Sequence, residues 1–148
     1  MARTAADEAL IRAARALVWM SLRAADQIGG VSVVQLRALT VLDGAGESNL
    51  ARLTEGMGVT MSTTSRLVDR LVGAGLVDRR PAAHTRRELA LRLTPLGKRT
   101  LDRYDELRLV ELRSCIDALP AGERAAAVAG LRAIENRAAG TVSQPTTA

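Results

Sequence analysis

The sequence predicts a mainly α-helical protein with one small β-hairpin. Apolar residues recur at three- and four-residue spacing through most of the 148 residues, a pattern typical of amphipathic helices. Two short runs, 76–80 and 88–93, have the length of strands, and the second alternates apolar and polar residues. Glycines, prolines and capping residues separate these stretches, so each can be treated as one element.

Four helices are expected in the first half of the chain. They cover residues 7–28, residues 33–42, a short stretch that ends near Met57, and a stretch from Thr60 or Met61 to Gly73. Ser32 and Ser48 precede the second and third helices and are expected to act as N-caps, since a hydroxyl can accept the free N–H groups of a first turn. Gly29 and Gly30 are expected to end the first helix.

The second half begins with the hairpin and continues in two further helices. Gly75 stands where a left-handed helix end is expected, and residues 81–87 form the polar turn between the strands. Thr94 and Pro95 have the order of an N-cap and a first-turn proline, so a long helix should follow to about Leu119. Pro120 starts the last helix, and the polar tail from Gly140 is expected to be disordered.

The charge distribution favours a polyanionic partner. The net charge is +5 and the isoelectric point is about 10.8. Residues 79–99 hold seven basic residues and one acidic residue, so they exceed the charge of the whole chain. A solvated face is the plain alternative for such a run, but one sign of charge in so short a stretch favours nucleic acid first and an anionic membrane surface second.

The composition excludes several classes of protein. One cysteine and one histidine allow neither an internal disulfide nor a His/Cys zinc site, so no metal or other cofactor is expected. No apolar run has the length of a membrane span or a signal peptide, and a cytoplasmic location is expected. Aromatic residues make up 1% of the chain, too few for recognition of single strands by base stacking. We find no catalytic constellation and do not expect an enzyme.

The order helix, short helix, tight turn, helix and hairpin indicates a winged helix-turn-helix, whose second helix enters the major groove of duplex DNA. Hydroxyl and arginine side chains at its start, and arginines at the hairpin tip, are the candidate DNA contacts. These residues are Thr60, Ser62, Thr63, Thr64, Arg66, Arg70, Arg86 and Arg87. The last two are expected in the minor groove.

Four sequence motifs in this region resemble those of the MarR (multiple antibiotic resistance regulator) transcription factors. They are Leu50-Ala-Arg-Leu, Ser65-Arg-Leu-Val-Asp-Arg-Leu, Gly75-Leu-Val-Asp-Arg and Leu91-Arg-Leu-Thr-Pro-Leu-Gly. The likeness is strong over residues 32–97, whereas the flanking helices match in length and order. Each motif alone is weak, but the combination is specific.

This resemblance implies a homodimer on palindromic DNA, most often a repressor that a small lipophilic or phenolic effector releases. It divides the chain into an N-terminal dimerisation helix (1–30), a DNA-binding domain (31–97), C-terminal dimerisation helices (98–139) and the tail (140–148). The effector cleft of the family lies between the dimerisation helices and the DNA-binding lobe. Trp19, Met20 and Arg23 are candidate ligand contacts, with filling of the dimer core by Trp19 as the equal alternative.

Thr85 departs from the family pattern, which has an aspartate that braces the wing arginine. Two other functions stay open: a weakly specific architectural DNA binder that uses the same charge, and a ligand-binding dimer whose DNA binding has decayed, which only Thr85 supports. Asp69 is expected to pair with Arg66, with Arg70 or with a wing arginine. Cys115 is expected to be a buried structural thiol.

Overall fold

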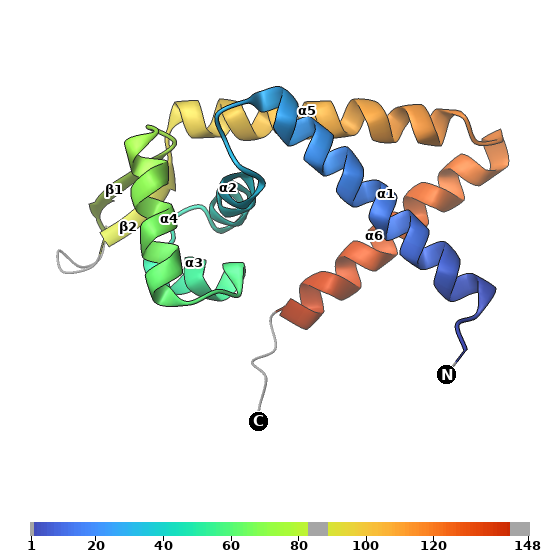
Figure 1. Cartoon of the computed structure of the whole chain (residues 1–148), viewed down its shortest axis with the longest axis horizontal. Coiled ribbons are helices and arrows are strands. Elements are labelled where there is room, and N and C mark those ends of the chain that lie inside the picture. The colour runs from blue at the N-terminus through green and yellow to red at the C-terminus, as the bar shows by residue number, and fades with distance from the viewer. Residues whose placement is uncertain (1, 83–88, 143–148) are drawn as a thin grey trace. The chain divides into compact units, whose positions relative to one another are not determined.

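We analysed a computed structural model, which describes residues 2–82 and 89–142. Six helices and one two-stranded antiparallel sheet make up the described part of the chain, which confirms the predicted fold class (Figure 1). The helices are α1 (Ala5–Ile28), α2 (Val33–Ala45), α3 (Leu50–Met57), α4 (Met61–Gly73), α5 (Pro95–Asp117) and α6 (Ala121–Val142). The strands are β1 (Val77–Pro81) and β2 (Leu89–Leu93). The chain forms two compact units, residues 1–108 and 109–148.

Local capping sets the starts of the helices. At α1 and α2, Thr4 and Ser32 accept from the backbone N–H three residues on, where Asp7 and Gln35 accept from the cap backbone in return. The hydrogen bonds from Thr4 lower the pKa of the Asp7 carboxyl. Because of this Thr4 cap, α1 begins two residues before the predicted start at Asp7.

Ser48 does not cap α3, contrary to the prediction. Asn49 is the N-cap, and its side chain accepts from the N–H of Arg52 at 2.9 Å. Ser48 instead pairs with Leu91 in an isolated antiparallel bridge, in which each backbone N–H donates to the carbonyl of the other residue. The bridge joins the segment before α3 to the outer edge of β2.

The hairpin pairs Val77 with Leu93 and Pro81 with Leu89. Each strand lies within one residue of its predicted bounds. Gly75 has φ +70°, as expected for the left-handed end of a helix. The Thr94 hydroxyl donates to the Gly75 carbonyl at 2.5 Å and accepts from the N–H of Gly97, so it joins this turn to the start of α5.

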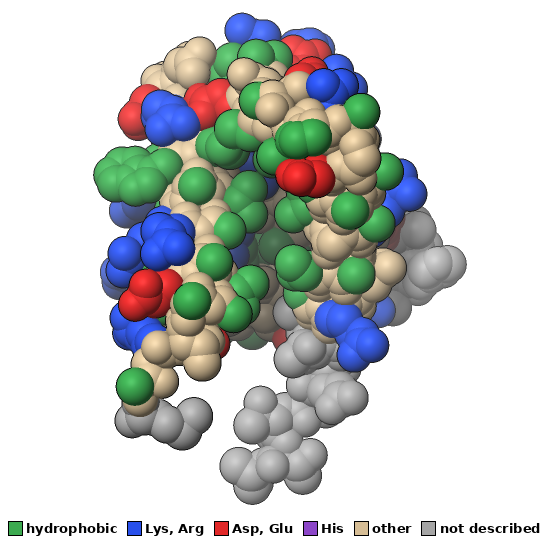
Figure 2. Space-filling model, turned by 90° about the vertical axis from the view of Figure 1, so that its right-hand side faces the viewer, with side chains coloured by type: hydrophobic (Ala, Val, Ile, Leu, Met, Phe, Trp, Pro, Cys, Tyr) green, Lys and Arg blue, Asp and Glu red, His purple; other side chains and the backbone are tan. Residues whose placement is uncertain are grey.

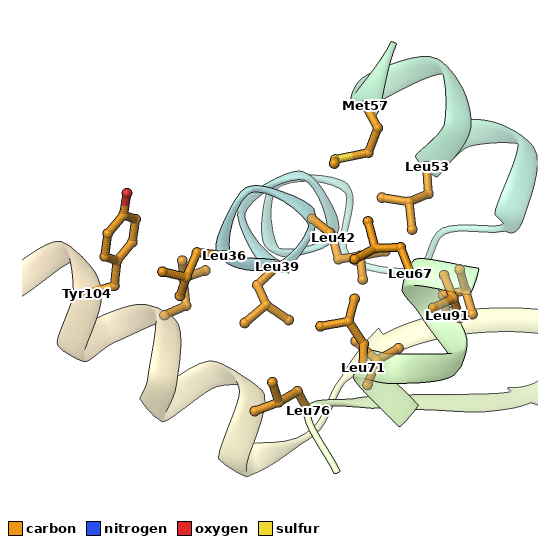
Figure 3. Packing of buried hydrophobic residues seen from close by; sticks show 14 of the residues in the cluster. Leu36, Leu39, Leu42, Leu53, Met57, Leu67, Leu71, Leu76, Leu91 and Tyr104 are labelled. Atoms are coloured by element: carbon orange, nitrogen blue, oxygen red, sulfur yellow. The ribbon is translucent and has the colours of Figure 1, made fainter. Parts of the chain in front are cut away.

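One apolar core holds α2, α3, α4 and the hairpin together with the first half of α5 (Figure 3). The largest of the completely buried side chains in this region are Leu36, Leu39, Leu42, Leu53, Thr64, Val68, Leu71 and Val77. Tyr104 of α5 covers one end of the core with its ring. Gly97 packs so closely that an added Cβ would lie 2.0 Å from the Leu76 carbonyl oxygen.

The flanking helices contribute little to this core. Ala24 and Ala25 are the buried residues of α1, and none of the described side chains of α6 is buried. α6 continues to Val142, past the predicted tail boundary at Gly140. Figure 2 shows apolar side chains exposed among charged ones on one face of the molecule.

No single described helix is long and apolar enough to cross a bilayer. As a pair, α1 and α2 reach that length and composition, but the chain bends by 99° between them.

Candidate nucleic-acid interface

Helix α4 presents a cluster of hydroxyl groups at its first turn. Thr60 is the N-cap, and its hydroxyl accepts from the N–H of Thr63 at 3.3 Å. The hydroxyl oxygens of Ser62 and Thr63 lie 3.2 and 2.9 Å from that of Thr60. All three residues are exposed. Each hydroxyl keeps spare hydrogen-bonding capacity, which phosphate oxygens or base edges can use.

Thr64 must be removed from the predicted DNA contacts. Its side chain is completely buried, and its hydroxyl donates to the Thr60 carbonyl at 3.1 Å. It lies on the same stripe of α4 as Leu67, Val68 and Leu71, all of which face the core. A residue on this stripe cannot reach DNA while α4 stays packed.

Arg66 and Arg70 lie on the exposed side of α4. Successive residues of a helix are about 100° apart, which places Ser62 and Arg66 almost opposite the buried stripe and Arg70 beside them. Neither arginine forms an ion pair with another described residue. Their charges are therefore available to an outside anion, and their role in DNA binding stays a prediction.

Asp69 pairs with the wing and not with its helical neighbours. The Arg79 Nη2 donates to the Asp69 Oδ1 at 2.6 Å. Of the three partners that the sequence left open, the structure therefore selects the wing arginine. This ion pair ties β1 to α4.

The positive charge of the basic segment 79–99 is less available to an outside anion than its sequence indicates. Of its five described basic residues, four pair with acids, and all five of these acids lie outside the segment. The pairs are Arg79 with Asp69, Arg80 with Asp78, Arg92 with Glu47, and Lys98 with both Asp43 and Asp102. Hydrogen bonds from Lys98 to Asp43 and Asp102 raise the pKa of its ammonium group. Folding thus neutralises much of the charge that first indicated a polyanion site.

The tip of the wing lies outside the described residues. His84, Thr85, Arg86 and Arg87 all fall in this part, so the expected minor-groove contact and the effect of Thr85 stay predictions.

Arg52 is a candidate contact that the sequence reasoning missed. It lies exposed on α3, the first helix of the helix-turn-helix, and has no ion pair with another described residue. In this motif the first helix crosses the DNA backbone, so an exposed arginine there suits a phosphate. Because Asn49 is the N-cap, Arg52 lies in the first turn of α3. The sequence pattern favoured Ser48 as the cap, and this position was therefore overlooked.

The predicted effector contacts lie on α1. Trp19 is 60% exposed, Met20 is half-buried and Arg23 is exposed. A cavity of about 350 Å³ lies elsewhere, between α2 and α5, and is lined by Val33, Arg37, Thr40, Val41, Tyr104 and Arg108. The Tyr104 hydroxyl points away from the core leucines (Figure 3).

Cys115 is exposed, which contradicts the predicted buried thiol. It lies near the end of α5, where few residues pack around the helix. Its apolar neighbours in sequence were therefore a poor guide to its burial.

Comparison with known proteins gives consistent results. A family model described as the MarR family matches residues 29–88. The HTH-type transcriptional regulator YfiV of Bacillus subtilis is 30% identical over 122 residues, which cover 80% of this chain and 72% of YfiV. The matched part includes the whole helix-turn-helix.

Solved structures share the fold over most of the chain. RV1404 from Mycobacterium tuberculosis superposes with a TM-score of 0.80 at 36% identity, over 92% of this chain and 96% of that one. A MarR family protein from Bacillus stearothermophilus gives 0.80 at 24% identity, over 90% and 92%.

Two more distant structures are of proteins that bind DNA. Staphylococcus aureus MepR, in a mutant bound to an oligodeoxyribonucleotide, has a TM-score of 0.69 at 14% identity, over 91% of this chain and 99% of that one. Bordetella bronchiseptica BpsR, whose DNA binding is regulated by 6-hydroxynicotinic acid, has 0.61 at 21% identity, over 86% and 91%.

Proposed function

The chain belongs to the MarR family of transcriptional regulators, and we propose that it is a homodimeric repressor that binds palindromic duplex DNA and leaves it when a small effector binds. The observation that carries the DNA-binding part is the exposed side of α4. Ser62, Arg66 and Arg70 lie there, and neither arginine has an ion pair with another residue that the structure describes, while the opposite stripe is fixed in the core. A helix held in this way can enter the major groove without distortion of the lobe.

In this proposal three groups of residues have distinct tasks. Ser62, Thr63, Arg66 and Arg70 contact base edges and phosphates in the major groove. Arg52 contacts the DNA backbone from α3, and Arg86 with Arg87 enters the adjacent minor groove. The structure of a MepR mutant bound to an oligodeoxyribonucleotide, which shares the fold, supports DNA as the partner.

The test is a binding titration of the purified protein on a duplex from its own promoter region and on random duplex, at near-physiological salt. We expect tight binding with a large ratio between the two duplexes. Arg66→Ala should cost about 1–3 kcal/mol on the promoter duplex and less on random DNA if it reads a base. Arg103→Ala on α5, which removes the same charge from a pair with Glu106, is the matched control.

Each alternative function has its own outcome in this titration. Weak binding that is equal on both duplexes, with a steep dependence on salt, would favour an architectural DNA binder. No binding to either duplex, together with retained ligand binding, would favour a dimer whose DNA function has decayed.

Exposed apolar side chains support the homodimer. On α1 these are Leu10, Leu17, Val18 and Trp19, and on α6 they are Val128 and Ile134. Burial of such side chains stabilises an interface by about 25 cal/mol per Å² of apolar area. A two-fold dimer would also place two copies of α4 on successive half-sites. Sedimentation equilibrium should give twice the mass of 15.7 kDa.

The cavity between α2 and α5 supports an effector that is a small organic anion. Arg37 supplies positive charge, Arg108 supplies a guanidinium that is paired with Asp105, Tyr104 supplies a hydroxyl, and Val33 and Val41 supply apolar walls. This composition fits an aromatic carboxylate. The regulation of BpsR by 6-hydroxynicotinic acid is consistent with that class.

A thermal shift assay with 6-hydroxynicotinate or benzoate tests the effector site. Arg37→Ala should abolish the shift, while Arg103→Ala should retain it. A shift lost instead on Arg23→Ala would place the ligand at Trp19, Met20 and Arg23.

A further inference from the structure

Helix α4 carries a carboxylate on the side proposed to face DNA. Ser62, Arg66, Asp69 and Gly73 follow one another at four-, three- and four-residue steps, which places them on one side of the helix. The Asp69 side chain is 60% exposed. Unpaired, it would repel the phosphates that approach α4, because DNA carries one negative charge per ~1.7 Å of its axis.

Arg79 supplies the opposite charge from a different element. It lies on β1, where it pairs with Leu91 of β2, so the sheet fixes its backbone. Its side chain is 35% exposed, and its guanidinium forms a charge-assisted hydrogen bond of 2.6 Å to Asp69. Figure 1 shows α4 alongside the hairpin, the two elements that this ion pair joins.

The neighbouring pair on the same strand differs in one useful respect. Arg80 pairs with Asp78, two residues away on β1, and its side chain is 72% exposed. This pair joins nothing beyond its own strand. It has the same residue types as the Asp69–Arg79 pair but no connection to α4, so it is a matched control.

We infer that Arg79 is a positioning residue for DNA recognition: it acts by neutralising Asp69 on the DNA-facing side of α4. The inference rests on the proposed DNA binding. Arg79 acts through Asp69 and does not itself contact DNA. The most harmful state is therefore Asp69 without Arg79, because the carboxylate then faces the phosphates alone.

A double-mutant cycle on the affinity for the promoter duplex tests this inference. Arg79→Ala is expected to weaken binding roughly tenfold or more. Asp69→Ala should change it by less than about threefold, and the double variant Asp69→Ala/Arg79→Ala should recover to within about threefold of the wild type. Arg80→Ala should stay close to the wild type, and Arg79→Lys should retain part of the binding.

Other roles of Arg79 give different results. If Arg79 contacts a phosphate, Arg79→Ala and the double variant bind equally weakly, and both lower the salt slope by about one. If its role is stability alone, the melting temperature falls in parallel with the affinity and the double variant does not recover. Either result overturns the inference while wild-type binding upholds the proposed function. Failure of the wild type to bind any duplex overturns both.

Discussion

The winged lobe and the flanking helices differ in what they bury. In the lobe, α2 alone buries Leu36, Ala38, Leu39 and Leu42, although it has 13 residues. α1 has 24 residues and buries two alanines, and the described side chains of α6 are all at least partly exposed. Both regions have regular helices, so helix formation does not distinguish them. The difference lies in the partners that each helix has within one chain.

This contrast teaches that one chain completes the lobe but leaves the flanking helices short of partners. Helical stability in proteins comes mainly from packing of an apolar face. Apolar faces such as that of Leu17 and Val18 on α1 are therefore expected to pack against another surface, which the proposed dimer would provide. The effects of mutations in the two regions on the free energy of unfolding should consequently depend differently on protein concentration.

The largest effect is expected in the lobe core. Leu71→Ala removes a fully buried side chain from α4 and should lower the free energy of unfolding by about 2–5 kcal/mol. The loss should be the same at low and high protein concentration. Ile134→Ala on α6 is the control. It should lower only the part of the free energy of unfolding that comes from dimer formation and depends on protein concentration. Urea unfolding at two protein concentrations distinguishes the two variants. A loss of stability in Leu71→Ala that depends on protein concentration would contradict the proposed difference between the lobe and the flanking helices.

The substitution of alanine for glycine should change the stability in opposite directions at two positions. Gly97→Ala places a Cβ against the Leu76 carbonyl, so α5 must shift, and we expect a loss of about 1–3 kcal/mol. Gly130→Ala on α6 meets no atom within 4 Å and replaces a poor helix former, so it should stabilise by up to about 1 kcal/mol. Thermal unfolding measures both. Destabilisation at both positions would show that α6 is as closely packed as the lobe.

A charge on α1 should affect assembly more than folding. Val18→Glu introduces a carboxylate into the exposed apolar face and should weaken the dimer at least tenfold, whereas the stability of the lobe should change by less than about 0.5 kcal/mol. Sedimentation gives the first quantity and urea unfolding of the monomer gives the second. Arg15→Gln on the same helix is the control. An unchanged dimer would exclude this face of α1 from the interface.

The smallest effect is expected from Lys98, which joins α5 to α2 through Asp43. Its pKa is raised in the folded protein, so its stabilising effect is complete below the ordinary lysine pKa and disappears as the pH rises through the raised value. Lys98→Met should therefore melt slightly below the wild type at neutral pH, and the two should converge at high pH. A constant difference at all pH values would assign the effect to packing instead.

Sequence reasoning succeeded where the determinants are local. Ser32 and Gly75 have the roles that the few residues around them predict, and the hairpin follows from two short patterns. It failed where the determinant lies far along the chain. Ser48 resembles a cap, but its partner Leu91 belongs to another element. Thr64 resembles a DNA contact until the stripe that it shares with Leu67 is found packed in the core.

Charge was the least predictable feature of the candidate site. Arg92 pairs with Glu47, 45 residues away, and no local sequence pattern predicts such a pair. Arg66 and Arg70 could be placed from helical spacing because they lie on one element. Residue types in the sequence therefore located the proposed interface, whereas the fold decided which of its charges are free.

The bridge between Ser48 and Leu91 has a consequence for hydrogen exchange. The Leu91 amide donates at 2.6 Å and the Ser48 amide at 3.2 Å, each to the other residue. Both amides are protected only when the wing and the segment before α3 are in place together. Their exchange rates should therefore rise together whenever the wing separates from the lobe, and these two amides become a direct reporter of that local opening.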